Sequence, residues 1–177
     1  MTGAPALVQI PADGAEWPDA FAREAARISA LMPGEIALHH IGSTAVPGCV
    51  AKPIVDMLGL VRTLPAVDTR TAEFQRLGYE AMGPYGIAER RYFRKRAQDG
   101  RRTHHLHVFV DGSAGAQRHI AFRDYLRRHP EAARAYSDLK ATLAAAPGAT
   151  WDSYVDGKDA FVQEMERAAL RWYGAGA

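Results

Sequence analysis

The spacing of apolar side chains changes along the chain between a helical period and a strand period, which predicts a mixed α/β fold. Residues 17–31 place Ala25 and Ile28 near one face, as an amphipathic helix does, and the Pro33-Gly34 pair ends that helix. Dense or alternating apolar residues predict strands at residues 36–41, 54–61, 91–96 and 104–110. A period near 3.6 predicts later helices at residues 67–77, 116–128, 131–145 and 151–172.

Most of the predicted strands precede most of the predicted helices. This order indicates an α/β fold with a mixed β-sheet, flanking helices that cover mainly one face, and a C-terminal helical portion. Residues 1–15 are expected to form an irregular lead-in. The length of 177 residues and the 47% apolar composition suit one domain over residues 1–177.

Compartment and membrane association can be predicted from a few features. The one cysteine, Cys49, excludes an internal disulfide and fits a reducing compartment. The N-terminal segment has no basic start followed by a long apolar run, so we expect no secretion signal. The longest apolar stretch, residues 54–61, contains Asp56 and is too short to cross a bilayer. We therefore expect a cytoplasmic protein without a membrane partner.

Basic residues concentrate in one stretch, although the net charge of the chain is only +2. Residues 90–102 hold seven basic residues and one acidic residue, a local charge of +6, and the rest of the chain sums to −4. A focused positive charge favours an anionic small molecule, with nucleic acid as a weaker candidate. The alternative is an arginine-rich hairpin that is simply solvated, and the sequence leaves both interpretations open.

The segment HHIGSTAVPG places Gly42 and Ser43 directly after a predicted strand. A glycine lets backbone N–H groups approach a phosphate closely, and the serine adds a hydroxyl donor. The segment is not a Walker loop, because no Gly-Lys-Ser or Gly-Lys-Thr follows. Gly-Ser turns are common, so this motif indicates a phosphate site only in combination with other residues.

Asp56 interrupts the apolar strand PIVDMLGLV. A carboxylate in such a strand is unfavourable unless it is paired or binds a metal. Strand alternation places Ile54, Asp56 and Leu58 on one face. Asp56 is therefore a candidate metal ligand, and pairing with an arginine near the strand end is the alternative.

The segment RRTHHLHVFV places His105, His107 and Phe109 on one strand face and an aliphatic set on the other. The aliphatic set is expected in the core, which leaves two imidazoles side by side on the open face. Such a pair can share a metal or hold an anion. A histidine-triad hydrolase would have a third histidine where Phe109 stands, which argues against that class. Two half-exposed histidines without a function are the alternative.

Two tyrosine–lysine pairs, Tyr136 with Lys140 and Tyr154 with Lys158, share a four-residue spacing on predicted helices. The second pair lies in an apolar stripe that starts at Trp151 and has a period near 3.6. Lys158 is therefore expected on the inward face of its helix, which is unusual for lysine. Its ammonium either extends along its stem to water or contacts a phosphate.

Together these segments resemble the GrpB-like family, of the UPF0157 type, in the nucleotidyltransferase superfamily. HHIGSTAVPGCVAKPIVDMLGLV resembles the family signature, and THHLHVF, AFRDYLRRHPEAARAYSDLK and YVDGKDAFV resemble its later motifs. The resemblance runs from about Trp17 to Trp172 and implies a nucleotidyltransferase-like mixed sheet. The family also resembles a domain appended to dephospho-CoA kinase in some bacteria, which implies a connection with nucleotide or coenzyme A metabolism.

The superfamily pattern is a Gly-Ser followed at some distance by an Asp on a strand, with a second carboxylate two residues later. By this match, Ser43 would contact a triphosphate and Asp56 would bind a metal, but Leu58 stands at the position of the second carboxylate. This departure argues against a two-metal mechanism. A neighbouring strand, which supplies a third carboxylate in the superfamily, offers His105 or His107 here, and imidazoles suit Zn²⁺ or Mn²⁺ better than Mg²⁺.

The resemblance therefore implies a nucleotidyl or phosphoryl transferase that uses a divalent metal (Mg, Mn or Zn) and a nucleoside triphosphate. Asp56 and Ser43 are the expected catalytic residues, and Asp56, His105 and His107 the expected metal ligands. The expected phosphate-binding residues are Gly42, Ser43, Lys52, Arg91, Arg94, Lys140 and Lys158. Two alternatives are a nucleotide-binding module without catalysis, favoured by Leu58, and a metal-dependent hydrolase, favoured by the histidines.

Overall fold

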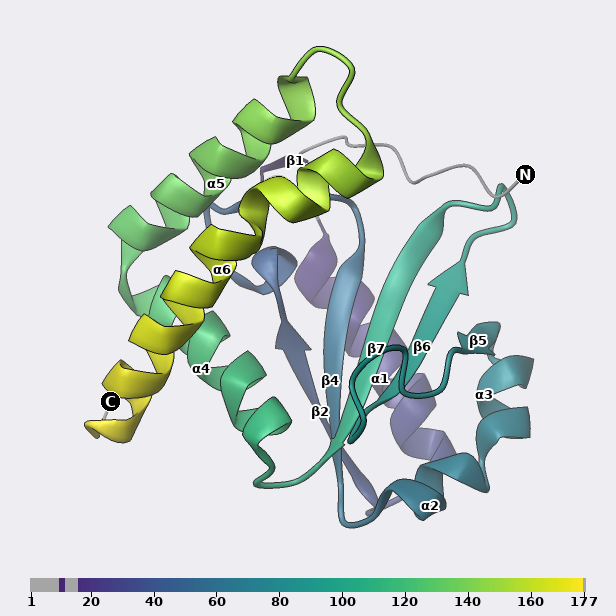
Figure 1. The fold of residues 1–177 in the computed structure, drawn as a ribbon. Coiled ribbons are helices and arrows are strands. Elements are labelled where there is room, and N and C mark those ends of the chain that lie inside the picture. Colours follow the sequence, from purple (N-terminus) through teal and green to yellow (C-terminus); the bar gives the residue numbers. More distant parts are fainter. Residues whose placement is uncertain (1–9, 12–15, 177) are drawn as a thin grey trace.

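A five-stranded mixed sheet forms the centre of the molecule (Figure 1). In this computed structural model, which describes residues 10–11 and 16–176, the strands lie in the order β2-β4-β7-β6-β5. The strands β4 and β7 are parallel, and every other neighbouring pair in this sheet is antiparallel. The bounds are β2 Ile36–Ile41, β4 Val55–Val61, β5 Tyr79–Ala81, β6 Arg91–Arg96 and β7 Arg102–Val110. A separate two-residue ladder joins β1 (Ile10–Pro11) to β3 (Val50–Ala51).

Helices cover both faces of the sheet (Figure 1). Met57 and Leu106 point to a core shared with α1 (Trp17–Leu31), α2 (Leu64–Asp68) and α3 (Thr71–Arg76). Leu58 and Phe109 point the other way, toward α4 (Ala114–Arg128), and α5 (Pro130–Ala145) and α6 (Trp151–Gly174) pack on α4. Met57 and Leu58 are both fully buried, so β4 needs cover on both sides, and the prediction that one face is mainly covered was wrong. No helix in the described part of the chain is long and apolar enough to cross a bilayer.

The predicted helix over residues 67–77 was also wrong, because the chain forms two short helices there. The Thr69 hydroxyl donates to the Ala66 carbonyl at 3.0 Å, and the Thr71 hydroxyl donates to the Asp68 carbonyl at 2.8 Å. These local bonds offer the backbone a turn in place of a continued helix. The other predicted helices and strands are present with small shifts at their ends. Most of the predicted lead-in lies outside the described residues, but Ile10–Pro11 forms β1.

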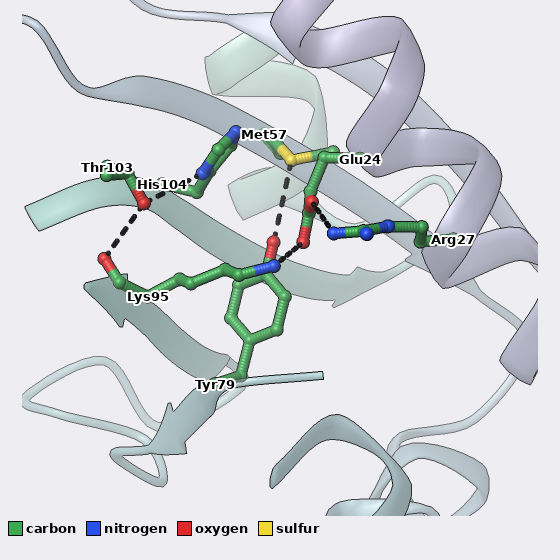
Figure 2. Close-up of polar contacts among 7 residues, drawn as sticks. All are labelled: Glu24, Arg27, Met57, Tyr79, Lys95, Thr103 and His104. Atoms are coloured by element: carbon green, nitrogen blue, oxygen red, sulfur yellow. Dashed lines mark hydrogen bonds and ion pairs between the residues drawn. The ribbon is translucent and has the colours of Figure 1, made fainter. Parts of the chain in front are cut away.

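A buried charge pair joins α1 to β6 (Figure 2). Lys95 shares its strand face with Phe93 of the α1 core, so the pair lies on the opposite face from the His105–His107 pair. The Lys95 Nζ on β6 donates to the Glu24 Oε1 on α1 at 2.7 Å, and Glu24 is 4% exposed. Arg27 lies 3.7 Å from the other carboxylate oxygen, and the Tyr79 hydroxyl lies beside the same cluster. Burial, together with the neighbouring Glu24 charge, raises the pKa of Tyr79 far above its usual range, so this phenol stays protonated.

We expect Lys95→Met to lower the free energy of unfolding by about 3 kcal/mol, because Glu24 would keep a buried charge without its main partner. The double variant Lys95→Met/Glu24→Leu should recover most of this loss, since no unpaired charge remains. Urea denaturation of both variants measures the effect. A double variant as unstable as the single one would show that the packing of the lysine stem, and not charge pairing, is what matters.

Candidate functional site

Gly42 and Asp56 lie in close contact where β2 ends and β4 begins. Ile41 pairs with Asp56 across the two strands, and the chain then turns through Gly42, whose φ is +72°. A Cβ on Gly42 would lie 2.8 Å from the Asp56 Oδ2, a distance that real Cβ atoms do not reach. Glycine therefore satisfies both the backbone conformation and the space next to the carboxylate. The turn that follows, η2 (Ser43–Ala45), is held directly beside Asp56.

The parallel pairing of β4 with β7 places the Asp56 carboxylate against two imidazoles. Asp56 pairs with His105, and Leu58 pairs with His107. The Asp56 Oδ1 lies 3.2 Å from the His105 Nδ1 and 3.9 Å from the His107 Nε2. Burial raises the pKa of Asp56, but the hydrogen bonds from His105 and His107 outweigh burial and hold the pKa well below its usual range. Asp56 is therefore ionised at neutral pH.

Arg90 determines which nitrogen of His107 carries the proton. The Arg90 side chain donates to the carbonyls of Pro84 at 3.2 Å and Tyr85 at 2.6 Å, and its Nη1 lies 3.4 Å from the His107 Nδ1. A guanidinium only donates, so the His107 Nδ1 accepts and the Nε2 carries the hydrogen. Burial lowers the pKa of His107, which keeps the ring neutral. His107 therefore presents an N–H to Asp56.

These residues supply only some of the ligands that a metal ion needs. Within residues 10–11 and 16–176, no group of three or more His, Cys, Asp or Glu side chains is arranged to hold a metal. The two histidines face the Asp56 Oδ1 as hydrogen-bond partners, whereas the Oδ2 lies beside Gly42. Asp56 alone remains a good oxygen ligand. A hard cation in this place would need further ligands from a bound phosphate and from water, as Mg²⁺ commonly does.

Three lysines line a cavity of about 260 Å³ above Asp56, which we call the basic pocket. They are Lys52, Lys140 and Lys158, three of the four lysines in the whole chain. Ser43 and both histidines line the same cavity, together with the aromatic rings of Tyr136, Trp151 and Tyr154. The structure therefore brings together most of the residues that the sequence suggested: Gly42, Ser43, Lys52, Asp56, His105, His107, Lys140 and Lys158.

Lys140 is the most deeply placed of the three lysines, at 2% exposure. Its Nζ donates to the Ser43 Oγ at 2.7 Å and to the Val50 carbonyl, and it lies 3.4 Å from the Cys49 Sγ. Burial lowers its pKa from the usual lysine value. Because Ser43 accepts from Lys140, its own hydrogen is not used in that bond, and the Tyr136 phenol lies within hydrogen-bonding reach of it.

Lys52 and Lys158 gather at the aromatic side of the pocket. The Lys52 Nζ lies 3.6 Å from the centre of the Trp151 ring and 4.8 Å from that of Tyr154, and the Lys158 Nζ lies 5.5 Å from the Tyr154 ring. Burial lowers the pKa of both lysines, and with the added repulsion of Lys158 that of Lys52 falls to about 7. Ring faces stabilise an ammonium without neutralising it, so each of these lysines that is protonated adds a positive charge, and Asp56 is the one lining carboxylate that offsets it.

Arg91 and Arg94 do not join the basic pocket. Arg91 shares a strand face with Phe93, which packs in the α1 core, so it lies on the opposite side of the sheet from Asp56 and binds Asp68 at 2.5 and 2.8 Å. Arg94 pairs with His105 in the sheet, but its guanidinium binds both oxygens of Glu80. Carboxylates already neutralise these two arginines, so neither contributes free charge to the site, whereas Arg90 of the same stretch contacts His107.

Leu58 and Phe109 occupy the positions where a second carboxylate or a third histidine would stand. Both are at most 1% exposed, and they pack against each other and Ala116 of α4. The expectation that the histidine face is open therefore holds only at one end of the strands. The described site has one strand carboxylate, Asp56.

A second cavity of about 180 Å³ adjoins the basic pocket at Asp56. Gly42, Asp56 and His107 line both cavities, and the second also has Arg118, His119 and Glu166. Burial lowers the pKa of His119 to about 4, so this imidazole is neutral at pH 7. Sequence reasoning missed these three residues. The three-residue spacing between Ala116, which is buried, and His119 indicates that both lie on the inner face of the helix. This spacing does not show which strand that face contacts.

Comparison with known proteins identifies relatives along almost the whole chain. The family described as GrpB protein matches residues 7–168. UPF0157 protein YqkA of Bacillus subtilis (strain 168) is 42% identical over 158 residues, covering 89% of this chain and 46% of the relative. A dephospho-CoA kinase of Mycolicibacterium paratuberculosis is 27% identical over 184 residues, covering 89% of this chain and 44% of the relative. The chain thus spans about half the length of these two proteins.

Two solved structures share the fold. The conserved protein GrpB from Enterococcus faecalis superposes with a TM-score of 0.87 at 39% identity and covers 94% of this chain and 99% of that one. The Cid1 poly(U) polymerase bound to MgATP gives a TM-score of 0.50 at 11% identity, over 72% of this chain and 41% of that one. The second likeness concerns the fold alone, and it confirms the expected nucleotidyltransferase-like sheet.

We expect Gly42→Ala to be more harmful than Gly34→Ala, although both glycines have φ +72°. A positive φ makes each alanine unfavourable, by about 1–2 kcal/mol in the left-handed region. The ψ of −172° at Gly42 adds to this, because that backbone region is almost exclusive to glycine. Gly34 has open space around its Cβ position, whereas Gly42 would also displace the Asp56 carboxylate. Urea denaturation gives the difference in stability, and NMR shifts of His105 and His107 should move only in the Gly42 variant. Equal stability losses and unchanged histidine shifts would rule out the close contact.

We also expect the affinity for sulfate to fall as the pH rises through about 7, because the Lys52 ammonium attracts an anion only while protonated. Sulfate does not titrate in this range, so the change reports on the protein. Calorimetry at about pH 6 and about pH 8, on either side of that pKa, measures it. The same titrations on Lys52→Met should show a weaker and flatter dependence. If wild type and Lys52→Met show the same pH dependence of sulfate affinity, a group other than Lys52 causes it.

Proposed function

The chain belongs to the GrpB family, and on that premise we propose that it binds the phosphates of a nucleoside triphosphate in the basic pocket and transfers a nucleotidyl or phosphoryl group. The observation that carries this proposal is the charge of the pocket. Lys52, Lys140 and Lys158 converge on a cavity in which Asp56 is the one lining carboxylate. Partly buried ammonium groups need an anionic partner, and a polyphosphate supplies several negative charges in one ligand.

Different residues of the pocket contact different parts of such a ligand. The turn at Gly42 and the hydroxyl of Ser43 face the pocket as phosphate donors, as in other backbone anion sites. Lys52 and Lys158 approach from the aromatic side and neutralise the charge that develops on the leaving phosphates. Lys140 fixes the orientation of Ser43 through their 2.7 Å hydrogen bond.

Asp56 is the residue that would hold a divalent cation in this proposal. His105 and His107 keep its carboxylate ionised and oriented, and the remaining ligands would come from the phosphates and water. A bound divalent cation would polarise the phosphate under attack. Because the protein supplies one carboxylate, the proposed cation binds tightly only together with the nucleotide.

A nucleotide-binding module without catalysis is the second candidate, and Leu58 is the observation that favours it. Its side chain is fully buried where a second metal-binding carboxylate would stand. The same pocket would then hold the nucleotide without turning it over.

We expect Ser43→Ala and Lys158→Met each to weaken binding of ATP with Mn²⁺ about tenfold or more, since a hydrogen bond to a charged group is worth about 1.5–3 kcal/mol. Arg167→Met is the matched control for Lys158→Met, because it removes an exposed cation from the same helix outside the pocket. Fluorescent-nucleotide titrations at two salt concentrations measure binding, and circular dichroism confirms folding.

Asp56→Asn should remove the contribution of Mn²⁺ to nucleotide affinity, whereas the metal-free affinity should not fall, because the variant removes a negative charge that repels the phosphates. A wild-type protein that binds no nucleotide with any divalent cation would disprove the proposal. Binding without any turnover would select the non-catalytic module. An Asp56→Asn variant that responds to Mn²⁺ like wild type would exclude Asp56 as the metal ligand.

A further inference from the structure

Asp56 lies between two cavities of opposite character. On one side is the basic pocket with its three lysines. On the other side is the smaller cavity, lined by Asp56, Arg118 and Glu166 among its charged groups. The Arg118 Nη1 lies 3.5 Å from the Glu166 Oε2, a loose pair at the limit of a hydrogen bond. The smaller cavity therefore carries two carboxylates against one guanidinium, and it does not favour a further polyphosphate.

His119 presents a free lone pair from the wall of the smaller cavity. Its Nδ1 lies 2.9 Å from the Gly115 carbonyl, four residues earlier on α4. A carbonyl only accepts, so the Nδ1 carries the hydrogen and the Nε2 is the unprotonated nitrogen. Among the described residues, no hydrogen bond to that Nε2 is formed, and the nitrogen is not sealed from the cavity. The ring lies 5.3 Å from that of His107, which donates to Asp56.

From this arrangement we infer that the smaller cavity is the acceptor site of the transfer reaction, that it takes a neutral or positively charged small molecule bearing a hydroxyl group, and that His119 is the general base. The inference rests on the proposed function. Glu166 in the wall repels an anionic acceptor, and its loose pairing with Arg118 leaves it able to meet a cationic group. The shared wall at Asp56 places acceptor and nucleotide on either side of one carboxylate.

The step balances with the groups present. The acceptor hydroxyl gives its proton to the His119 Nε2 while its oxygen forms a bond to the α-phosphorus. The bond between that phosphorus and the bridging oxygen breaks, and the electron pair leaves with pyrophosphate toward the lysines of the basic pocket. The imidazolium then returns the proton to water.

The test uses ATP with Mn²⁺ and three alcohols that differ in charge: choline, ethylene glycol and glycolate. Mass spectrometry detects the adenylylated alcohol, and a fluorescent-nucleotide titration measures ATP binding separately. We expect transfer to choline and ethylene glycol and little to glycolate. His119→Asn keeps a donor toward the Gly115 carbonyl and removes the base, so it should slow transfer about 100-fold or more while ATP affinity stays unchanged.

Matched variants separate this role from helix stability. His129 makes the same contact, 2.9 Å from the carbonyl four residues earlier, but lies outside the cavity, so His129→Asn should transfer normally. Glu166→Gln should reduce the preference for choline over glycolate, and Glu164→Gln, an exposed change on the same helix, should not.

The outcomes distinguish the two proposals. If ATP does not bind, the proposed function fails and this inference falls with it. If ATP binds but none of the three alcohols is modified, or glycolate is preferred, the acceptor site is wrong and nucleotide binding stands. If His119→Asn transfers as fast as wild type, His119 is not the base.

Discussion

The contact between the Asp56 carboxylate and two imidazoles is the interaction on which the rest of the site depends. It exists because β4 and β7 run parallel, which sets Asp56 directly beside His105 and two register positions from His107. A lone carboxylate on an apolar strand would be expelled or protonated, but these partners keep it charged and fixed. The Gly42 turn, the lysines and both cavities are arranged around that one charge.

Strand alternation was enough to predict the centre of the site. It placed Asp56 and Leu58 on one face of a strand, and His105, His107 and Phe109 on one face of another. These two sets of side chains come next to each other once the two strands are neighbours in the sheet. The same rule excludes Arg91, since it shares a face with Phe93, whose burial against α1 was not recognised from the sequence. The alternation of side chains along a strand therefore predicts which residues reach the site better than the local concentration of charge does.

What the sequence could not show is how helices meet the sheet. His119, Arg118 and Glu166 come together because α4 and α6 dock on the histidine face, and docking geometry depends on side chains far apart in the chain. The break between α2 and α3 was missed for a different reason: two threonine hydroxyls compete with the helical hydrogen bonds. The basic pocket was predicted in part, because the inward position of Lys158 follows from the spacing of its helix.

The hydrogen bonds of Lys140 have a consequence for how this protein could be divided. A single ammonium joins α5 to the Ser43 turn and to the carbonyl of Val50, so the helical layer and the sheet share one anchoring point inside the pocket. Helix and turn cannot separate as rigid bodies without breaking these hydrogen bonds. A sheet excised without α5 would lose the support of its turn, and the smallest unit that keeps this cavity intact extends through Lys158.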